Sequence, residues 1–261
     1  MLLSRVDLAG AAGRVRMAFT DRNGGYGHGA FGSFNLALHV GDDPSIVTAN
    51  RSLLGQALGI DRISFVQQVH GTAVHAVTAE SAASLGPVGA AASAPVEADA
   101  QVTDAFDVGL AILVADCTPV LLADPDAGVI AAVHAGRRGM VDGVVAATLK
   151  RMRARGAESI SAAIGPSIGP RRYEVPATMR DDVSAAEPVT ASVTRQGTPA
   201  LDVAAGVAEQ LVREGVSIRD WSPHCTFESN DLFSYRRDGT TGRFAGVVWM
   251  SSADGATRPS A

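Results

Sequence analysis

Hydrophobic positions along the chain occur mostly in short runs that are rich in valine and isoleucine. Runs of four to eight apolar residues, bounded by glycine, proline or polar residues, are typical of β-strands. The run LAILVADC at residues 110–117 stands out because its apolar stretch ends abruptly in an acid and a thiol. The pattern predicts strands over residues 14–19, 63–69, 73–78, 99–103, 108–115, 119–123, 129–134, 159–164, 216–220 and 243–250.

Apolar positions with helical spacing are fewer. Val141, Val145 and Leu149 recur at every fourth position, and Gly156 follows as a stop signal. Helices are predicted over residues 44–58, 139–153, 176–186 and 202–214. The strands do not alternate regularly with these helices, and no glycine-rich phosphate loop follows a first strand. The pattern therefore predicts an α+β fold with a mixed or antiparallel sheet.

Two further segments differ in composition from the predicted elements. Residues 81–98 are small, nearly uncharged and contain proline and glycine, which predicts a flexible surface loop within the domain. Residues 251–261 are expected to form a frayed tail. The core is therefore expected to span about residues 14–250.

A predicted hairpin places the thiol of the opening run beside a histidine. Residues 125–128, PDAG, carry proline, aspartate and glycine where a four-residue hairpin loop needs them. If Asp124 pairs with Val129, His134 faces Pro119, and Cys117 lies two residues further along on the face of His134. Such diagonal neighbours are roughly 7–8 Å apart at the backbone. A slip of one residue would put the two side chains on opposite faces, so this prediction depends on the turn.

A thiol and an imidazole that converge have three interpretations. Cysteine can simply be a small buried hydrophobe, the two groups can form a nucleophile pair, or both can bind a metal. A metal needs a further ligand, and His70 in QQVHG, at the end of a predicted strand, is the candidate. Three protein ligands with an open fourth position is the pattern of a catalytic zinc.

The segment HAGRRG leads from His134 directly into the predicted helix 139–153. The start of that helix, together with Arg137 and Arg138, would suit an anion such as phosphate.

Composition limits the class of protein. The 261 residues fit one large or two small domains, and 46% are hydrophobic, as in a globular protein with a sizeable core. A net charge of −5 leaves no basic surface for nucleic acid. Arg5 and Asp7 interrupt the apolar N-terminal stretch, so no signal peptide is expected, and no apolar run is long enough for a membrane span. We expect a cytoplasmic protein with two reduced cysteines, Cys117 and Cys225.

Six segments in order resemble one known family, the YfiH family of laccase-domain proteins. They are GDDPSIVTANR, QVHG, ADCTPVLLADP, AAVHAGRRG, AIGPSIGPRRYEV and FSYRRDGTTGRFAG. Members of the family are described as purine nucleoside phosphorylases and were earlier described as multicopper polyphenol oxidases. The resemblance covers residues 14–250 and implies a single domain of mixed sheets flanked by helices, similar to cysteine-hydrolase-like toxin domains.

The resemblance also implies a site and an activity. His70, Cys117 and His134 match the zinc-binding and catalytic residues of the family. The implied reactions are phosphorolysis of adenosine, inosine and methylthioadenosine, and deamination of adenosine. The substrates would be purine nucleosides and phosphate. The family has tryptophan where this chain has Arg137; an aromatic side chain there could stack on a purine or wall the pocket, so the change bears on substrate preference.

Further roles are predicted from position. Arg51 and Arg138 are candidate phosphate ligands, Asn35 and Gln68 are candidate nucleoside contacts, and Asp116 is expected to orient a ligand or the backbone beside the metal.

Three alternatives remain at this level. The set of two histidines and one cysteine also occurs in blue-copper sites, which leaves a copper-dependent phenol oxidase open. However, the chain has six histidines and no His-X-His pair, too few for a multicopper cluster. A thiol nucleophile, Cys117 with His134 as its base, would make an amide hydrolase or deamidase. A zinc-stabilised binding module is the non-enzymatic alternative, although structural zinc usually has four protein ligands.

Overall fold

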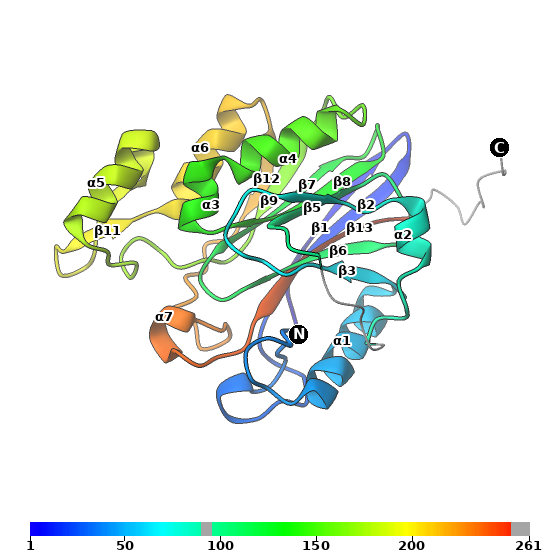
Figure 1. Cartoon of the computed structure of the whole chain (residues 1–261), viewed down its shortest axis with the longest axis horizontal. Helices are drawn as coiled ribbons and strands as arrows, with labels where there is room; N and C mark the ends of the chain where they lie inside the picture. The colour runs from blue at the N-terminus through cyan, green and yellow to red at the C-terminus, as the bar shows by residue number, and fades with distance from the viewer. Residues whose placement is uncertain (90–95, 252–261) are drawn as a thin grey trace.

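The computed structural model describes residues 1–89 and 96–251. Most strands belong to two mixed sheets that pack face to face (Figure 1). In sheet order, the first sheet contains β1 (Leu2–Gly10), β2 (Gly13–Thr20), β13 (Phe244–Ser251), β6 (Gly109–Val114) and β3 (Ile63–Phe65). The second contains β12 (Ser217–Trp221), β9 (Ser161–Ile164), β7 (Thr118–Asp124), β8 (Val129–Ala135), β5 (Ala100–Thr103) and β4 (Val74–Ala76). A small hairpin is formed by β10 (Ala191–Val193) and β11 (Pro199–Leu201).

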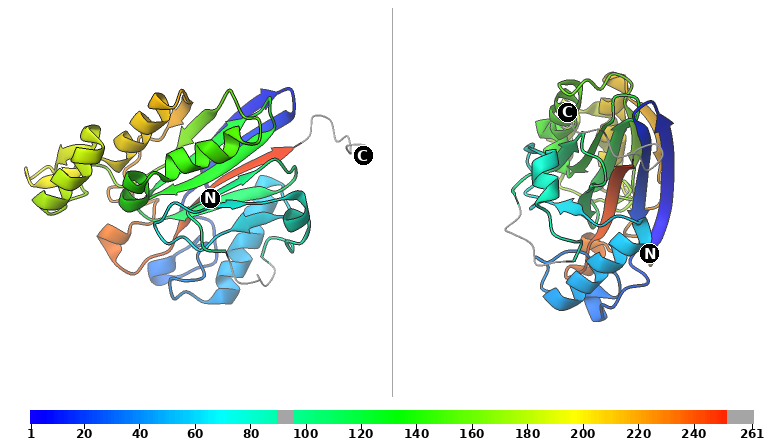
Figure 2. Two further views of the ribbon diagram at one scale, coloured as in Figure 1. Left: turned by 45° about the horizontal axis from the view of Figure 1, so that its top comes forward. Right: turned by 90° about the vertical axis from the view of Figure 1, so that its right-hand side faces the viewer.

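Helices cover the outer faces of both sheets, which gives the layers seen in Figure 2. The helix α1 (Pro44–Leu58) packs on the five-stranded sheet. The other face carries α3 (Arg137–Asp142), α4 (Val144–Arg153), α5 (Ala177–Ala186) and α6 (Val203–Arg213). Short helices complete the described chain: α2 (Ala79–Ala83), α7 (Tyr235–Asp238) and the 3-10 turns Gly29–Phe31 and Pro188–Thr190. None of the helices in the described ranges is long and apolar enough to cross a membrane.

The central strands are apolar on both faces because each face belongs to a different core. In β7, Val120 and Leu122 pack toward the helices, whereas Leu121 and Ala123 pack between the two sheets. This double burial explains why such strands appear in the sequence as continuous apolar runs. Three strand pairs are parallel, β3 with β6, β4 with β5 and β9 with β12, and the other pairs are antiparallel. The expected α+β class with mixed sheets flanked by helices is confirmed.

Some predicted boundaries are wrong. The first strand, β1, lies before the expected core boundary at residue 14, because this edge strand mixes charged with apolar residues and has no continuous apolar run. The expected helix 139–153 is two helices that begin at Arg137 and are separated by Gly143, whose φ of 94° ends the first helix. Residues 81–83, expected in a loop, end helix α2, while residues 90–95 and 252–261 lie outside the described ranges.

Candidate metal centre

The hairpin of β7 and β8 has the register that the turn predicts. Asp124 pairs with Val129, and Pro119 pairs with His134. Cys117 comes directly before β7, and its side chain lies near that of His134. His70 lies in the segment after β3 and completes the group. The three residues each offer one nitrogen or sulfur atom, and these atoms all lie within 4.8 Å of one another. The structure therefore brings together the three residues that the sequence nominated.

A buried carboxylate holds both histidines in place. Asp99 is fully buried at the start of the β5 segment, and it accepts a hydrogen bond from Nδ1 of His134 at 2.8 Å. The same carboxylate accepts the backbone N–H groups of His70 at 2.8 Å and Gly71 at 2.6 Å. Because Nδ1 of His134 is engaged, its Nε2 is the atom left to bind a metal, an arrangement common among metal-ligating histidines.

The backbone around the three donors is closely packed. His70 has a φ of 62°, the left-handed region that few residues other than glycine adopt. A Cβ atom at Gly136 would lie 2.7 Å from Cδ2 of His70 and 3.2 Å from Sγ of Cys117. Glycine at this position therefore leaves the space that both donors occupy.

Electrostatics favour the metal-binding form of the thiol. Burial alone would raise the pKa of Cys117, but the charge of His134 and hydrogen bonds from both imidazoles lower it to about 6. Burial disfavours the charged form of His134, whereas the Cys117 thiolate and Asp99 raise its pKa to about 9. Without a metal, both shifts favour the thiolate of Cys117 and the imidazolium of His134. Thiolate is the form of cysteine that binds metals, and binding would displace the proton of His134.

The donor set fits zinc. Two imidazole nitrogens and one thiolate are ligands that zinc accepts, and three protein ligands leave one position open. The three donor residues line a cavity of about 450 Å³. The cavity is lined by His39, Gln68, His70, Leu113, Val114, Ala115, Asp116, Cys117, His134, Arg137, Ile168, Tyr173, Val203, Tyr235, Arg236 and Arg243.

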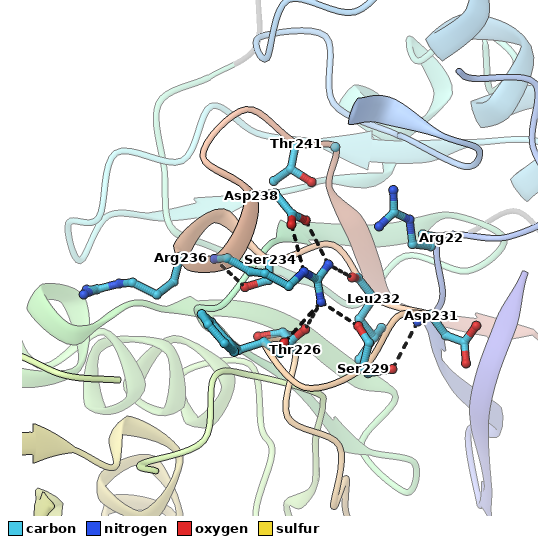
Figure 3. Close-up of polar contacts among 12 residues, drawn as sticks. Arg22, Thr226, Ser229, Asp231, Leu232, Ser234, Arg236, Asp238 and Thr241 are labelled. Atoms are coloured by element: carbon cyan, nitrogen blue, oxygen red, sulfur yellow. Dashed lines mark hydrogen bonds and ion pairs between the residues drawn. The ribbon is translucent and has the colours of Figure 1, made fainter. Parts of the chain in front are cut away.

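Asp116, expected beside the metal, orients a neighbouring loop. Its Oδ1 accepts the hydroxyls of Thr226 at 2.6 Å and Ser234 at 2.7 Å, and its Oδ2 accepts the N–H of Arg236 at 2.6 Å. Arg237 donates to the carbonyl groups of residues 226, 227, 229 and 232. Figure 3 shows the polar contacts within this loop, around Thr226, Ser229 and Leu232, with the Arg236 side chain extending away from them. The loop that carries Tyr235 and Arg236 is thereby fixed at the edge of the cavity.

Of the four predicted substrate contacts, only Gln68 lines the cavity. Its side-chain Nε2 donates a hydrogen bond to the carbonyl of Leu113 at 2.7 Å, and its Oε1 accepts one from the N–H of Leu113 at 2.8 Å. Asn35 is buried, and its side-chain amide instead forms hydrogen bonds with Ala37, Asp42 and Arg243.

The two predicted phosphate ligands also lie elsewhere. Arg51 is buried, donates to the carbonyl of Leu36 at 2.9 Å and lies over the ring of Phe65. Arg138 is exposed and lies 3.5 Å from Asp142 in an ion pair. Arg137, rather than Arg138, lines the cavity. Successive residues of a helix point about 100° apart, so the side chain of Arg138 points in a different direction.

The sequence reasoning missed several residues of the site. Asp99 is an acid at the start of the predicted strand 99–103, which is the signal that could have marked it. Tyr173, Arg236 and Arg243 lie in segments already recognised as motifs, but distant segments meet at the cavity only in the folded chain.

Comparison with known proteins gives concordant results. Residues 16–251 match the family described as multi-copper polyphenol oxidoreductase laccase. The chain is 50% identical over 246 residues to the purine nucleoside phosphorylase ORF3 of Streptomyces griseus, covering 93% of this chain and 97% of that protein.

Solved structures are similar over most of the chain as well. The Neisseria meningitidis protein NMB0706 has 34% identity and a TM-score of 0.81, with 95% of this chain and 99% of that chain covered. The hypothetical protein YfiH of Bacillus licheniformis has 29% identity and a TM-score of 0.80, with 91% and 93% covered.

Proposed function

The chain belongs to the multi-copper polyphenol oxidoreductase laccase family, and from this premise we propose that it is a zinc-dependent purine nucleoside phosphorylase. The family expected from the sequence motifs is thereby confirmed. Curated relatives that cover nearly the whole chain are named purine nucleoside phosphorylases, which supports an enzyme of that class. The proposed substrates are adenosine, inosine and methylthioadenosine, with phosphate as the second substrate.

The observation that carries the proposal is the convergence of His70, Cys117 and His134 at one side of a cavity. A cavity of about 450 Å³ is within the range of small-molecule sites. Zinc, when bound by these three residues, would supply a Lewis acid at the cavity wall. Cys117 and both histidines would hold it, and Asp99 would keep the imidazole of His134 in the orientation that binding needs.

The reaction that the cavity must accommodate is a substitution at the sugar. The bond between C1′ and the base nitrogen breaks, with its electron pair going to the base. A phosphate oxygen forms the new bond to C1′, and the base gains one proton. The products are a free purine base and a sugar 1-phosphate. The cavity wall would bind the two substrates together and so convert a bimolecular step into one within a complex.

We propose deamination of adenosine as a second reaction of the same site. In that reaction water replaces the amino group, so that a carbon–oxygen bond forms, a carbon–nitrogen bond breaks and ammonia leaves. Ammonia released from adenosine without phosphate is the corresponding assay. Because the reactions need Cys117 as a thiol or thiolate, we place the protein in a reducing compartment, the cytoplasm.

The copper alternative is disfavoured by the number of ligands. All six histidines lie within the described ranges, and only His39 lines the cavity beyond His70 and His134. In the described chain no second group of three metal-binding side chains lies close together. A multicopper oxidase would need further imidazoles at this place. Copper-loaded protein with intense blue colour and turnover of phenols would contradict the zinc assignment.

One specific observation favours a second candidate, a thiol hydrolase. Asp99, His134 and Cys117 interact in sequence, as the acid, the base and the nucleophile of a catalytic triad do. That chemistry would have no use for His70, whose Nε2 nevertheless lies 3.6 Å from Sγ of Cys117. The third donor is therefore better explained by a metal.

The test replaces Cys117 with alanine and, as a matched control, the half-buried Cys225 with serine. We expect about one zinc per chain and phosphate-dependent release of hypoxanthine from inosine in the wild type and in Cys225→Ser. Cys117→Ala should lose both. Unchanged zinc content and turnover in Cys117→Ala would contradict the assignment of the site.

A further inference from the structure

Three arginines from separate segments line the cavity beside the metal-binding trio. Arg137 begins α3, Arg236 lies in α7, and Arg243 directly precedes β13. In the described ranges, none of the three guanidinium groups lies within 4 Å of a carboxylate oxygen, unlike those of Arg138, Arg153 or Arg172. The cavity therefore holds three positive charges without local ion pairs.

Arg243 is fixed by the fold with part of its guanidinium group free. Its backbone N–H donates to Oδ1 of Asn35 at 2.9 Å, and Nη1 donates to the carbonyl groups of Thr241 and Gly242. Nε and Nη2 make no hydrogen bond within the described part of the chain. Burial lowers the pKa of Arg243, so the cation has lost part of its hydration without gaining an ion-pair partner.

Arg137 and Arg236 both lie near Tyr173 in the cavity wall. The guanidinium carbon of Arg236 lies 5.0 Å from the ring centroid of Tyr173, and its Nη1 donates to the carbonyl of Glu174 at 3.0 Å. Burial raises the pKa of Tyr173, while the positive charge of Arg137 acts in the opposite direction. Tyr173 thus connects two of the three arginines across one wall of the cavity.

The negative groups of the cavity are already engaged. Both oxygens of Asp116, the one carboxylate among the lining residues, accept hydrogen bonds from the 226–236 loop. Sγ of Cys117 faces the two histidines. Three guanidinium groups with free N–H donors are consequently left for a ligand with several acceptor oxygens. A tetrahedral phosphate is such a ligand, because arginine can donate to it in a bidentate manner.

We propose that Arg137, Arg236 and Arg243 form the subsite for the phosphate substrate, an inference that rests on the proposed phosphorylase function. The subsite would hold phosphate next to the trio, where it can reach C1′ of a nucleoside. Arg236 owes its position to Asp116 and the loop, Arg243 to Asn35, and Arg137 to the start of α3. Asn35 and Asp116 therefore act on phosphate as positioning residues.

The test uses the zinc-loaded protein and three neutral variants, Arg137→Gln, Arg236→Gln and Arg243→Gln. Hydrogen bonds to charged groups are strong enough that each variant should raise the KM for phosphate roughly tenfold or more. The KM for inosine at saturating phosphate should change by less than about threefold, because glutamine retains much of the side chain's volume. Arg137→Lys should bind phosphate more tightly than Arg137→Gln but less tightly than the wild type, since lysine restores the charge but cannot donate in a bidentate manner.

The control is Arg151→Gln, an exposed arginine of α4 outside the cavity, for which both KM values should stay unchanged. Arg138→Gln tests the rival position. If Arg138→Gln raises the KM for phosphate and Arg137→Gln does not, the subsite is wrong. Unchanged phosphate KM in all three cavity variants would also overturn it.

A binding measurement separates this inference from the proposed function. Inorganic phosphate is titrated calorimetrically into each zinc-loaded protein without nucleoside. If phosphate binds the wild type, the three variants weaken binding and inosine is not cleaved, the subsite stands and the phosphorylase function fails. If inosine is cleaved with phosphate but the variants bind phosphate like the wild type, the function stands and the subsite fails. Thermal unfolding of each variant confirms that it is folded.

Discussion

The carboxylate of Asp99 accepts a hydrogen bond from Nδ1 of His134 at 2.8 Å, while its own backbone carbonyl accepts the N–H of the same histidine at 2.7 Å. Side chain and main chain of His134 are thus fixed by one residue, which directly precedes the neighbouring strand β5. Through its second oxygen Asp99 also holds the backbone after β3. One buried acid therefore sets the relative positions of two of the three proposed metal ligands.

Replacing Asp99 with asparagine should weaken zinc binding about 10- to 100-fold, the usual cost of losing the partner of a ligating histidine. An asparagine NH₂ group would also face N–H donors that now meet an oxygen. Competition with a chelator measures the affinity, and Asp104→Asn, an exposed acid nearby, is the control. Wild-type zinc affinity in Asp99→Asn would show that the carboxylate does not set the site.

Gly136→Ala should reduce zinc affinity and activity more than it reduces stability. The new Cβ would lie 2.7 Å from His70 and 3.2 Å from Cys117, so both donors would have to move. Gly169→Ala is a matched control, because its Cβ would lie 3.4 Å from Sγ of Cys225, an ordinary contact. Zinc titration and thermal unfolding of both variants are the measurements. An equal response of the two variants would contradict the prediction.

Alkylation distinguishes the metal centre from a thiol nucleophile. In metal-free protein at pH 7, iodoacetamide should modify Cys117 faster than an ordinary cysteine, because its pKa is about 6 and most of the thiol is ionised. Zinc should protect Cys117 by occupying the sulfur. Peptide mass spectrometry follows Cys117 and Cys225 separately. Equal rates with and without zinc would favour the hydrolase.

Asp116→Asn should raise the KM for phosphate through Arg236, because one of the oxygens that fix the loop becomes a donor. The smaller change Thr226→Val removes a single hydrogen bond and should have a smaller effect. Steady-state kinetics with phosphate varied at saturating inosine measure both. A KM for phosphate that stays at the wild-type value in Asp116→Asn would mean that the loop does not position Arg236 for the ligand.

Asp124 makes a pH-dependent contribution to stability. It is buried, and although burial raises its pKa, backbone N–H groups of Ala127, Glu158, Ser159 and Asp126 lower it below the usual value. A lowered folded-state pKa means that this stabilisation is complete above the unfolded pKa of about 3.9 and is lost as pH falls through the folded pKa.

The free energy of unfolding of Asp124→Asn should therefore be about 2 kcal/mol lower than that of the wild type at pH 7. This difference should become smaller as the pH falls. Urea unfolding from pH 7 to pH 3 measures the free energies. Asp182→Asn, an exposed position in α5, is the control and should leave the difference near zero throughout. A gap for Asp124→Asn that stays constant with pH would contradict the role of the carboxylate.

The sequence alone determined the elements whose signals are local. The turn at residues 125–128 fixed the pairing of β7 with β8, since a four-residue loop allows one register, and that register brought Cys117 toward His134. Continuous apolar runs identified the central strands because both of their faces are buried. Helix α1 was predicted with its observed bounds, and in the structure Asp43 caps its start and Gly59 follows its end.

Only the tertiary structure decided what else meets at the cavity. Asp99, Tyr173, Arg236 and Arg243 come from segments far apart in the sequence, and no local pattern states which of them face one another. The same holds for the arginines after His134: the direction of each side chain depends on where the helix begins, so Arg137 faces the cavity and Arg138 faces solvent. The sequence nominated the donors, and long-range packing selected the groups that surround them.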